Sequence, residues 1–251
     1  MTWHATTTHH AEFDAVIIDL DGTLVDTLGD FVAVLELLRA DFVMKGYVTE
    51  PFTASTVEPM VGKGSENLVK TALFALNRLS GQVLVAGDAI NSEANFVWAC
   101  TRYQQHYRAV SGQHAVIYPG VLSGLQALQT SGLLLACVTN KPVAFAKPLL
   151  TQLGLAEFFS HVFGGDSFAR KKPDPMPLLK TCEALKTMPS RTLMVGDSSN
   201  DAEAARAAGC RVVLVTYGYN HGKAISDVDA DGFIDSLAEL AADHDFTARS
   251  C

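Results

Sequence analysis

Short apolar runs alternate with longer segments of helical periodicity along the second half of the chain. Runs rich in Val, Ile and Leu predict buried strands at 15–18, 133–138, 161–164, 192–195, 211–215 and 232–234. Apolar residues at three- and four-residue steps predict helices at 121–130, 145–153, 178–185 and 201–208. This alternation predicts an α/β fold, a Rossmann-like parallel sheet with helices on both faces.

The segment between the first two predicted strands has a different pattern. Helical spacing dominates at 31–38, 66–79 and 94–107, and a stretch without clear periodicity at 51–64 separates the first two helices. We therefore predict two units: an α/β core formed by residues 1–27 and 113–251, and an α-helical domain inserted at residues 28–112.

Polar residues follow three of the predicted strands. Asp19 and Asp21 come after 15–18, Thr139 after 133–138, and Asp197 after 192–195. Ligands of parallel α/β sheets bind at the carboxyl ends of the strands, so these side chains should converge. Two carboxyl groups at the mouth of a buried strand are costly to desolvate and suggest a metal ion or a reaction. Taken by itself, the tetrapeptide D-L-D-G at residues 19–22 would equally fit a strand followed by an ordinary Asp-Gly turn.

Composition narrows the possible functions. The net charge is −8, and we find no cluster of basic residues beyond 170–172, which argues against nucleic acid as a partner. No apolar run approaches the roughly 20 residues needed to span a membrane, and the N-terminus lacks the pattern of a secretory signal. The five cysteines are scattered and form no CxxC pair, which favours a reducing, cytoplasmic setting.

Four motifs together resemble the haloacid dehalogenase superfamily. The stretch D-L-D-G-T-L-V-D-T at 19–27 is similar to its first motif, and Thr139 stands at the end of the second strand. Lys172 lies in K-P-D-P, and G-D-S-S-N-D occupies 196–201. The motifs occur in the family's order. Thr139 alone would fit any strand end, and Lys171 is an alternative to Lys172, although the K-P match favours Lys172 and leaves Lys171 solvated.

The resemblance implies phosphoryl transfer through an aspartyl-phosphate. Asp19 would be the nucleophile, and Asp21 would protonate the leaving oxygen and later activate water. Mg²⁺ would be the cofactor, held by Asp19, the backbone carbonyl of Asp21, and Asp197. Asp201 would stabilise the metal site or Lys172 by hydrogen bonding, without being a direct metal ligand. The phosphate and the rest of the substrate would be bound by Gly22, Lys63, Thr139, Asn140 and Lys172.

Within the superfamily, Asp21 favours phosphate esters, because the dehalogenases and phosphonate hydrolases lack this acid. The insertion occupies the position of the superfamily's helical cap. Stretches at 61–64, 171–179, 195–201, 207–210 and 216–220 resemble the phosphoglycolate phosphatase group. Its substrate, 2-phosphoglycolate, carries a carboxylate that Lys63 could bind, although Lys63 equally fits an exposed lysine in a glycine-rich loop.

Asp30 fits either a hinge or a substrate-facing role. Leu28–Gly29 departs from the family's Ala/Val-Pro and puts the cap geometry in doubt.

Other functions stay open at this stage. A sugar phosphatase or a β-phosphoglucomutase-like enzyme would use the same core motifs with a different cap. A non-catalytic phosphate-binding module would not need all of Asp19, Asp21, Thr139, Lys172 and Asp197. The expected partner is a small phosphorylated metabolite, and the sequence is compatible with a monomer or a homodimer.

Overall fold

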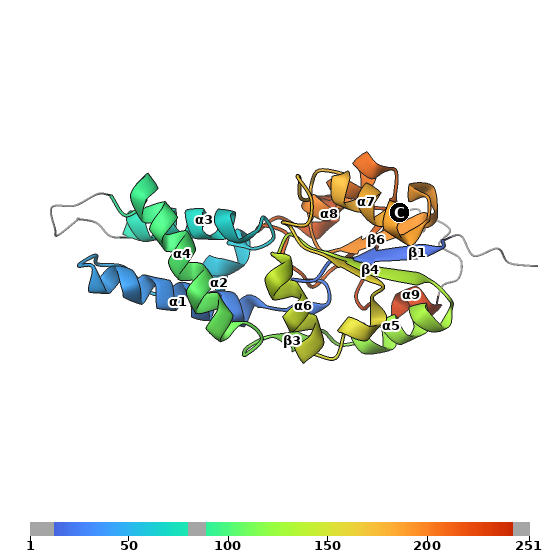
Figure 1. Ribbon diagram of the computed structural model, residues 1–251, viewed down its shortest axis with the longest axis horizontal. Coiled ribbons are helices and arrows are strands. Elements are labelled where there is room, and N and C mark those ends of the chain that lie inside the picture. Colours follow the sequence, from blue (N-terminus) through green and yellow to red (C-terminus); the bar gives the residue numbers. More distant parts are fainter. Residues whose placement is uncertain (1–12, 80–88, 243–251) are drawn as a thin grey trace, which may run out of the picture.

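A six-stranded parallel sheet forms the centre of the computed structural model, which describes residues 13–79 and 89–242 (Figure 1). The strand order is β5-β4-β1-β6-β7-β8. The bounds are β1 (Ala15–Ile18), β4 (Leu134–Val138), β5 (His161–Phe163), β6 (Thr192–Gly196), β7 (Arg211–Val215) and β8 (Gly232–Ile234). Strand β1 is central, with Ile17 opposite Ala136 of β4 and Met194 of β6. The carboxyl ends of β1, β4 and β6 therefore lie side by side.

Helices cover both faces of the sheet, as the sequence predicts. Side chains alternate along each strand, so Val16 and Ile18 pack on one face while Ile17 packs on the other. The first face carries α5 (Val121–Thr130), α6 (Val143–Gln152) and the short α9 (Glu239–Ala242), and the second carries α7 (Met176–Leu185) and α8 (Ser199–Ala208). The predicted α/β fold is confirmed.

A second hydrophobic core lies in the helical part, beside the carboxyl ends of the strands (Figure 1). It is built by α1 (Leu28–Met44), α2 (Ala54–Val57), α3 (Ser65–Leu79) and α4 (Glu93–Val110). The three long helices were predicted, but α1 extends beyond its expected end at residue 38. Helix α2 and the following 3₁₀ turn, Glu58–Met60, were not predicted, because both are too short for a periodic signal. The proposed cap domain, residues 28–112, spans these helices.

Two short strands join the helical part to the core. β2 (Val25–Asp26) pairs antiparallel with β3 (Val116–Ile117), with Val25 opposite Ile117. This pair was not predicted, since two residues cannot display an alternating pattern. The pair places the point where the chain leaves the core next to the point where it returns.

The remaining described segments are turns and loops. Further 3₁₀ turns lie at Ala156–Phe158, Pro189–Arg191 and Ile225–Asp227. Within the described ranges, no helix is both long and apolar enough to cross a lipid bilayer.

Candidate active site

The first two carboxylates lie where β1 gives way to a tight loop. Asp19 ends the strand, with its backbone N–H donating to the carbonyl of Val195, and the carbonyl of Leu20 then accepts from the amides of Thr23, Leu24 and Val25. Gly22 has a φ of +89°, and a Cβ there would overlap the carboxylate of Asp197. Gly22, predicted to bind substrate, lies against Asp197 and allows the close approach of that side chain.

The polar strand ends converge on one pocket between the core and the helical part. Its floor contains the side chains predicted from the motifs, namely Asp19, Asp21, Thr139, Asn140, Lys172, Asp197 and Asp201. Its roof is apolar and aromatic, and comes mainly from α1, α3 and α4 through Phe31, Leu68, Tyr103 and Tyr107. Charged groups that are buried beneath an apolar roof interact strongly, because water screens them poorly.

Lys172 holds two of these carboxylates together. Its ammonium lies 2.7 Å from Asp19 Oδ1 and 2.6 Å from Asp201 Oδ1, and it also donates to the carbonyl of Val138. Burial alone would lower the pKa of Lys172, but the charges of Asp19 and Asp201 outweigh that effect and raise it. Lys172 therefore stays a cation. Of the adjacent lysines 171 and 172, only Lys172 contacts Asp19.

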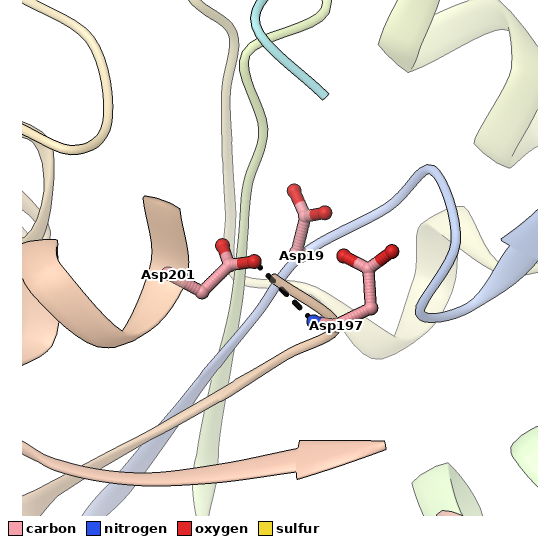
Figure 2. A group of neighbouring side chains, drawn as sticks. All are labelled: Asp19, Asp197 and Asp201. Atoms are coloured by element: carbon pink, nitrogen blue, oxygen red, sulfur yellow. Dashed lines mark hydrogen bonds between the residues drawn. The ribbon is translucent and has the colours of Figure 1, made fainter. Parts of the chain in front are cut away.

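Three carboxylates form a cluster beside Lys172 (Figure 2). Asp19, Asp197 and Asp201 each place a carboxylate oxygen within 4.8 Å of the others. Both oxygens of Asp201 are already engaged: one accepts from Lys172, and the other accepts from the hydroxyl and amide of Ser198 and the amide of Asp197. Asp201 thus acts as a support for its neighbours, at the first turn of α8.

Asp19 and Asp197 are the members of the cluster whose carboxylates accept the fewest hydrogen bonds in the described structure. Asp197 accepts from the amide of Tyr219 and, at 3.4 Å, from the hydroxyl of Thr23, and within the described residues it has no ion-pair partner. Burial and the charges of Asp201 and Asp19 raise its pKa well above the usual range. Burial also raises the pKa of Asp19 to about 7, with the Lys172 charge opposing this effect. A hard divalent cation such as Mg²⁺ prefers oxygen ligands of this kind and would neutralise both groups, so the donor set fits the predicted metal.

Thr139 and Asn140 lie at the end of β4, inside the pocket. The Thr139 hydroxyl accepts from the amide of Lys141 at 3.2 Å, which fixes its direction. The Asn140 amide donates to the carbonyls of Gly62 and Lys172, whereas its own Oδ1 is buried without a hydrogen-bond partner in the described structure. An unpaired buried acceptor in a pocket is available to a ligand that donates.

The glycine-rich loop of the helical part is held against the core through its backbone. The Gly62 carbonyl accepts from the Asn140 and Asn200 side chains, and the Lys63 carbonyl accepts from the Lys171 ammonium at 2.9 Å. Lys171, which was expected to be solvated, therefore makes this contact. The Lys63 side chain is exposed and, unlike Gly62 and Gly64 on either side, is not among the residues that line the pocket.

Lys141 also lines the pocket, although it was not predicted from the sequence. Its ammonium lies 2.8 Å from Asp21 Oδ1, and the same oxygen accepts from the Thr27 hydroxyl. Burial by itself would lower the pKa of Lys141, but the charge of Asp21 raises it. The available signal was positional: Lys141 follows Thr139 by two residues, at a strand end where functional side chains gather.

Asp30 lies at the junction between the two parts and does not line the pocket. It is fully buried, and its carboxylate accepts from the amides of Gly112 and His114 at 2.6 and 2.8 Å. It therefore ties the start of α1 to the segment that follows α4. A side chain at the preceding Gly29 would meet the Cβ of His114 at 2.7 Å, which explains why a small residue stands there.

Replacing Asp30 by Ala is expected to lower the free energy of unfolding by about 2–4 kcal/mol, because two amides lose their charged acceptor. Urea denaturation measures the loss, and Asp30→Asn, which keeps one acceptor oxygen, should lose less. A variant with native stability but strongly reduced activity would instead indicate that Asp30 faces the substrate.

The comparisons with known proteins agree with this geometry. Residues 16–215 match the family model described as haloacid dehalogenase-like hydrolase. A phosphoglycolate phosphatase of Thiobacillus denitrificans is 40% identical over 228 residues, covering 90% of this chain and 93% of that protein. One of Nitrosospira multiformis is 42% identical over 225 residues, covering 90% and 92%.

A solved structure also resembles this chain over nearly its whole length. The crystal structure of a predicted phosphoglycolate phosphatase from Haemophilus somnus superimposes with a TM-score of 0.83 at 31% identity, covering 92% of this chain and 97% of that one. The family model extends from β1 to the end of β7 and includes every predicted core motif. The chain belongs to the haloacid dehalogenase-like hydrolase family.

Proposed function

We propose that this protein is a Mg²⁺-dependent phosphatase for a small phosphate monoester, with 2-phosphoglycolate as the preferred substrate and glycolate and phosphate as products. The observation that carries the proposal is the arrangement around Asp19. One oxygen of Asp19 is held by Lys172, and the other side of the group faces the Asp197 carboxylate cluster. The phosphoglycolate phosphatases that align over nine tenths of the chain support the choice of substrate.

Asp19 is the nucleophile of the first step. Lys172 fixes one carboxylate oxygen, so the other is free to attack phosphorus. A bond forms between Asp19 and phosphorus, the ester bond breaks, and the departing oxygen takes a proton from Asp21. Thr139 and Lys172 line the same pocket and compensate the charge of the phosphoryl oxygens.

Asp21 acts again in the second step. It removes a proton from a water molecule that attacks phosphorus, and the bond to Asp19 breaks to release phosphate and restore the carboxylate. The Thr27 hydroxyl holds Asp21 by a hydrogen bond of 2.8 Å and orients it in both steps. The apolar roof of Phe31, Leu68 and Tyr107 excludes other water molecules from the phosphorylated site.

Mg²⁺ would be held by Asp19, Asp197 and the backbone carbonyl of Asp21. When bound, it supplies positive charge against the phosphate dianion, which otherwise repels the attacking carboxylate. Asp201 does not bind the metal in this proposal. It accepts hydrogen bonds from Lys172 and Ser198 and so stabilises the positions of both. The small phosphorylated metabolite is the proposed partner, and the buried free thiols at 137, 182 and 210 support the proposed cytoplasmic setting.

Phosphate release from 2-phosphoglycolate, β-glucose 1-phosphate and several sugar phosphates, each with Mg²⁺ and with EDTA, tests the proposal. We expect turnover that requires Mg²⁺ and favours 2-phosphoglycolate. Broad activity would retain the chemistry and exclude the specific substrate, whereas conversion of glucose 1-phosphate to its isomer would indicate a mutase. A protein that binds phosphate but hydrolyses none of these esters would be a binding module.

A further inference from the structure

We propose that Lys141 and Tyr107 together form a subsite that binds a carboxylate carried by the substrate beyond its ester oxygen. This inference rests on the proposed function, because it takes the phosphoryl group to lie against Asp19. It assigns recognition of the acid group to a lysine of the core and a tyrosine of the cap.

Lys141 lies inside the pocket beside Asp21. Its ammonium is buried in the pocket, 2.8 Å from Asp21 Oδ1. The aromatic rings of Phe31 and Tyr107 each place their centres 4.9 Å from it, so the cation lies between the floor and the roof of the pocket. Its one ion-pair partner among the described residues is Asp21, the group that faces the ester oxygen in the proposed reaction.

Positive charge in the pocket is divided between two lysines. Among the described residues that line the pocket, two are cations, Lys141 and Lys172. Lys172 is committed to Asp19 and Asp201, on the side where the phosphoryl group reacts. Lys141 is therefore the cation on the side of the leaving group. A carboxylate attached one carbon beyond the ester oxygen comes within reach of it, and an ion pair with the substrate then replaces the ion pair with Asp21.

The Tyr107 hydroxyl is a buried donor in the same pocket. Tyr107 is 1% exposed and lines the pocket, and its hydroxyl has no hydrogen-bond partner in the described part of the chain. Buried hydroxyls are normally satisfied, so an unpaired one in a pocket indicates a missing partner. Burial raises the pKa of this phenol, with the Lys141 charge opposing the effect, so the group remains an O–H donor. A carboxylate accepts from both the ammonium and the hydroxyl.

The packing of Tyr107 keeps it in place for this role. Its ring stacks with Tyr103 at 5.5 Å between centres, and Phe145 of α6 meets it edge-on at 4.8 Å. Contacts from both the cap and the core thus hold the Tyr107 side chain in place. Lys63, the sequence-based candidate for the same carboxylate, is exposed and lies outside the pocket lining.

The test compares kcat/KM for 2-phosphoglycolate with kcat/KM for 2-hydroxyethyl phosphate, an ester of similar size in which a neutral CH₂OH replaces the carboxylate. We expect Lys141→Met to lower this ratio by about 100-fold, since a charged partner is lost, and Tyr107→Phe to lower it by about 10-fold. Any effect that acts through Asp21 changes both substrates alike and cancels in the ratio. Lys147→Met, an exposed lysine on α6, is the matched control and should leave the ratio unchanged.

The outcomes separate this inference from the proposed function. A native enzyme that prefers 2-phosphoglycolate while Lys141→Met and Tyr107→Phe keep that preference overturns the subsite alone. A fall in the ratio caused by Lys63→Ala instead would assign the carboxylate to Lys63. A native enzyme that hydrolyses both esters equally overturns the subsite but retains the phosphatase, and one that hydrolyses neither overturns both. If Lys141→Met does not fold, Tyr107→Phe decides alone, because it removes an oxygen that makes no hydrogen bond to the described residues.

Discussion

Asp19→Asn is expected to fold normally, to bind the substrate with Mg²⁺, and to lose turnover by a factor of about 10⁴ or more, as enzymes do when a covalent nucleophile is removed. An amide oxygen can still accept from Lys172, so the local packing survives. What the variant lacks is a carboxylate oxygen able to form the bond to phosphorus. Single-turnover release of phosphate measures the loss of turnover, and circular dichroism measures whether the variant folds.

Asp14→Asn is the matched control for that experiment. Asp14 precedes the amino end of β1, at the opposite end of this strand from the pocket, and is paired with Arg191 near the surface. The same substitution there should leave turnover close to native. A near-native rate for Asp19→Asn would rule out the covalent mechanism.

Asp197→Asn is expected to have two opposite effects on stability. Without metal, its thermal midpoint should exceed that of the native chain by about 2–5 °C, because a buried carboxylate without a cationic partner is replaced by a neutral group of the same shape. With saturating Mg²⁺ the order should reverse. The native protein gains about 2.7 kcal/mol at a metal concentration 100 times its dissociation constant, and the variant loses most of this gain.

The stability difference between the metal-free native protein and Asp197→Asn should depend on pH. The reason is the raised pKa of Asp197, which is caused by burial and by the charges of Asp201 and Asp19. The unfolded chain releases this proton near pH 4, whereas the folded chain retains it to higher pH. The metal-free native protein therefore loses stability as pH rises above about 4, until the folded group also ionises. Asp197→Asn should lack this part of the decline. Thermal melts in EDTA between pH 5 and 8 measure this decline in stability, with Asp227→Asn, a substitution at an exposed position, as control.

Equal stabilisation of variant and native protein by Mg²⁺ would remove Asp197 from the metal site.

The sheet and the floor of the pocket could be predicted because each has a strong local signal. The strands of the core are short apolar runs, and their carboxyl ends carry Asp19, Thr139 and Asp197. Once the strands are parallel and adjacent, geometry alone brings these residues together. Lys172 required more, since only its K-P motif pointed to it, and it reaches Asp19 from a loop far along the chain.

The roof of the pocket could not be predicted in the same way. Tyr103 and Tyr107 recur at helical spacing on α4, which describes a core face as well as a binding surface. Lys141 carries no motif, and whether a lysine at a strand end turns inward depends on which rings cover it. Here Phe31 and Tyr107 do so from another part of the chain. Such contacts depend on how the helical part docks, and no local pattern encodes that docking.

The β2–β3 pair has a consequence for how such proteins can diversify. Because Val25 lies opposite Ile117, the intervening chain starts and finishes at nearly the same point in space. A segment with adjoining ends can be exchanged for one of another length at little entropic cost to the scaffold that carries it. An exchange of the helical segment would therefore replace the roof residues Phe31, Leu68, Tyr103 and Tyr107, while Asp19 and Lys141 of the core stayed in place.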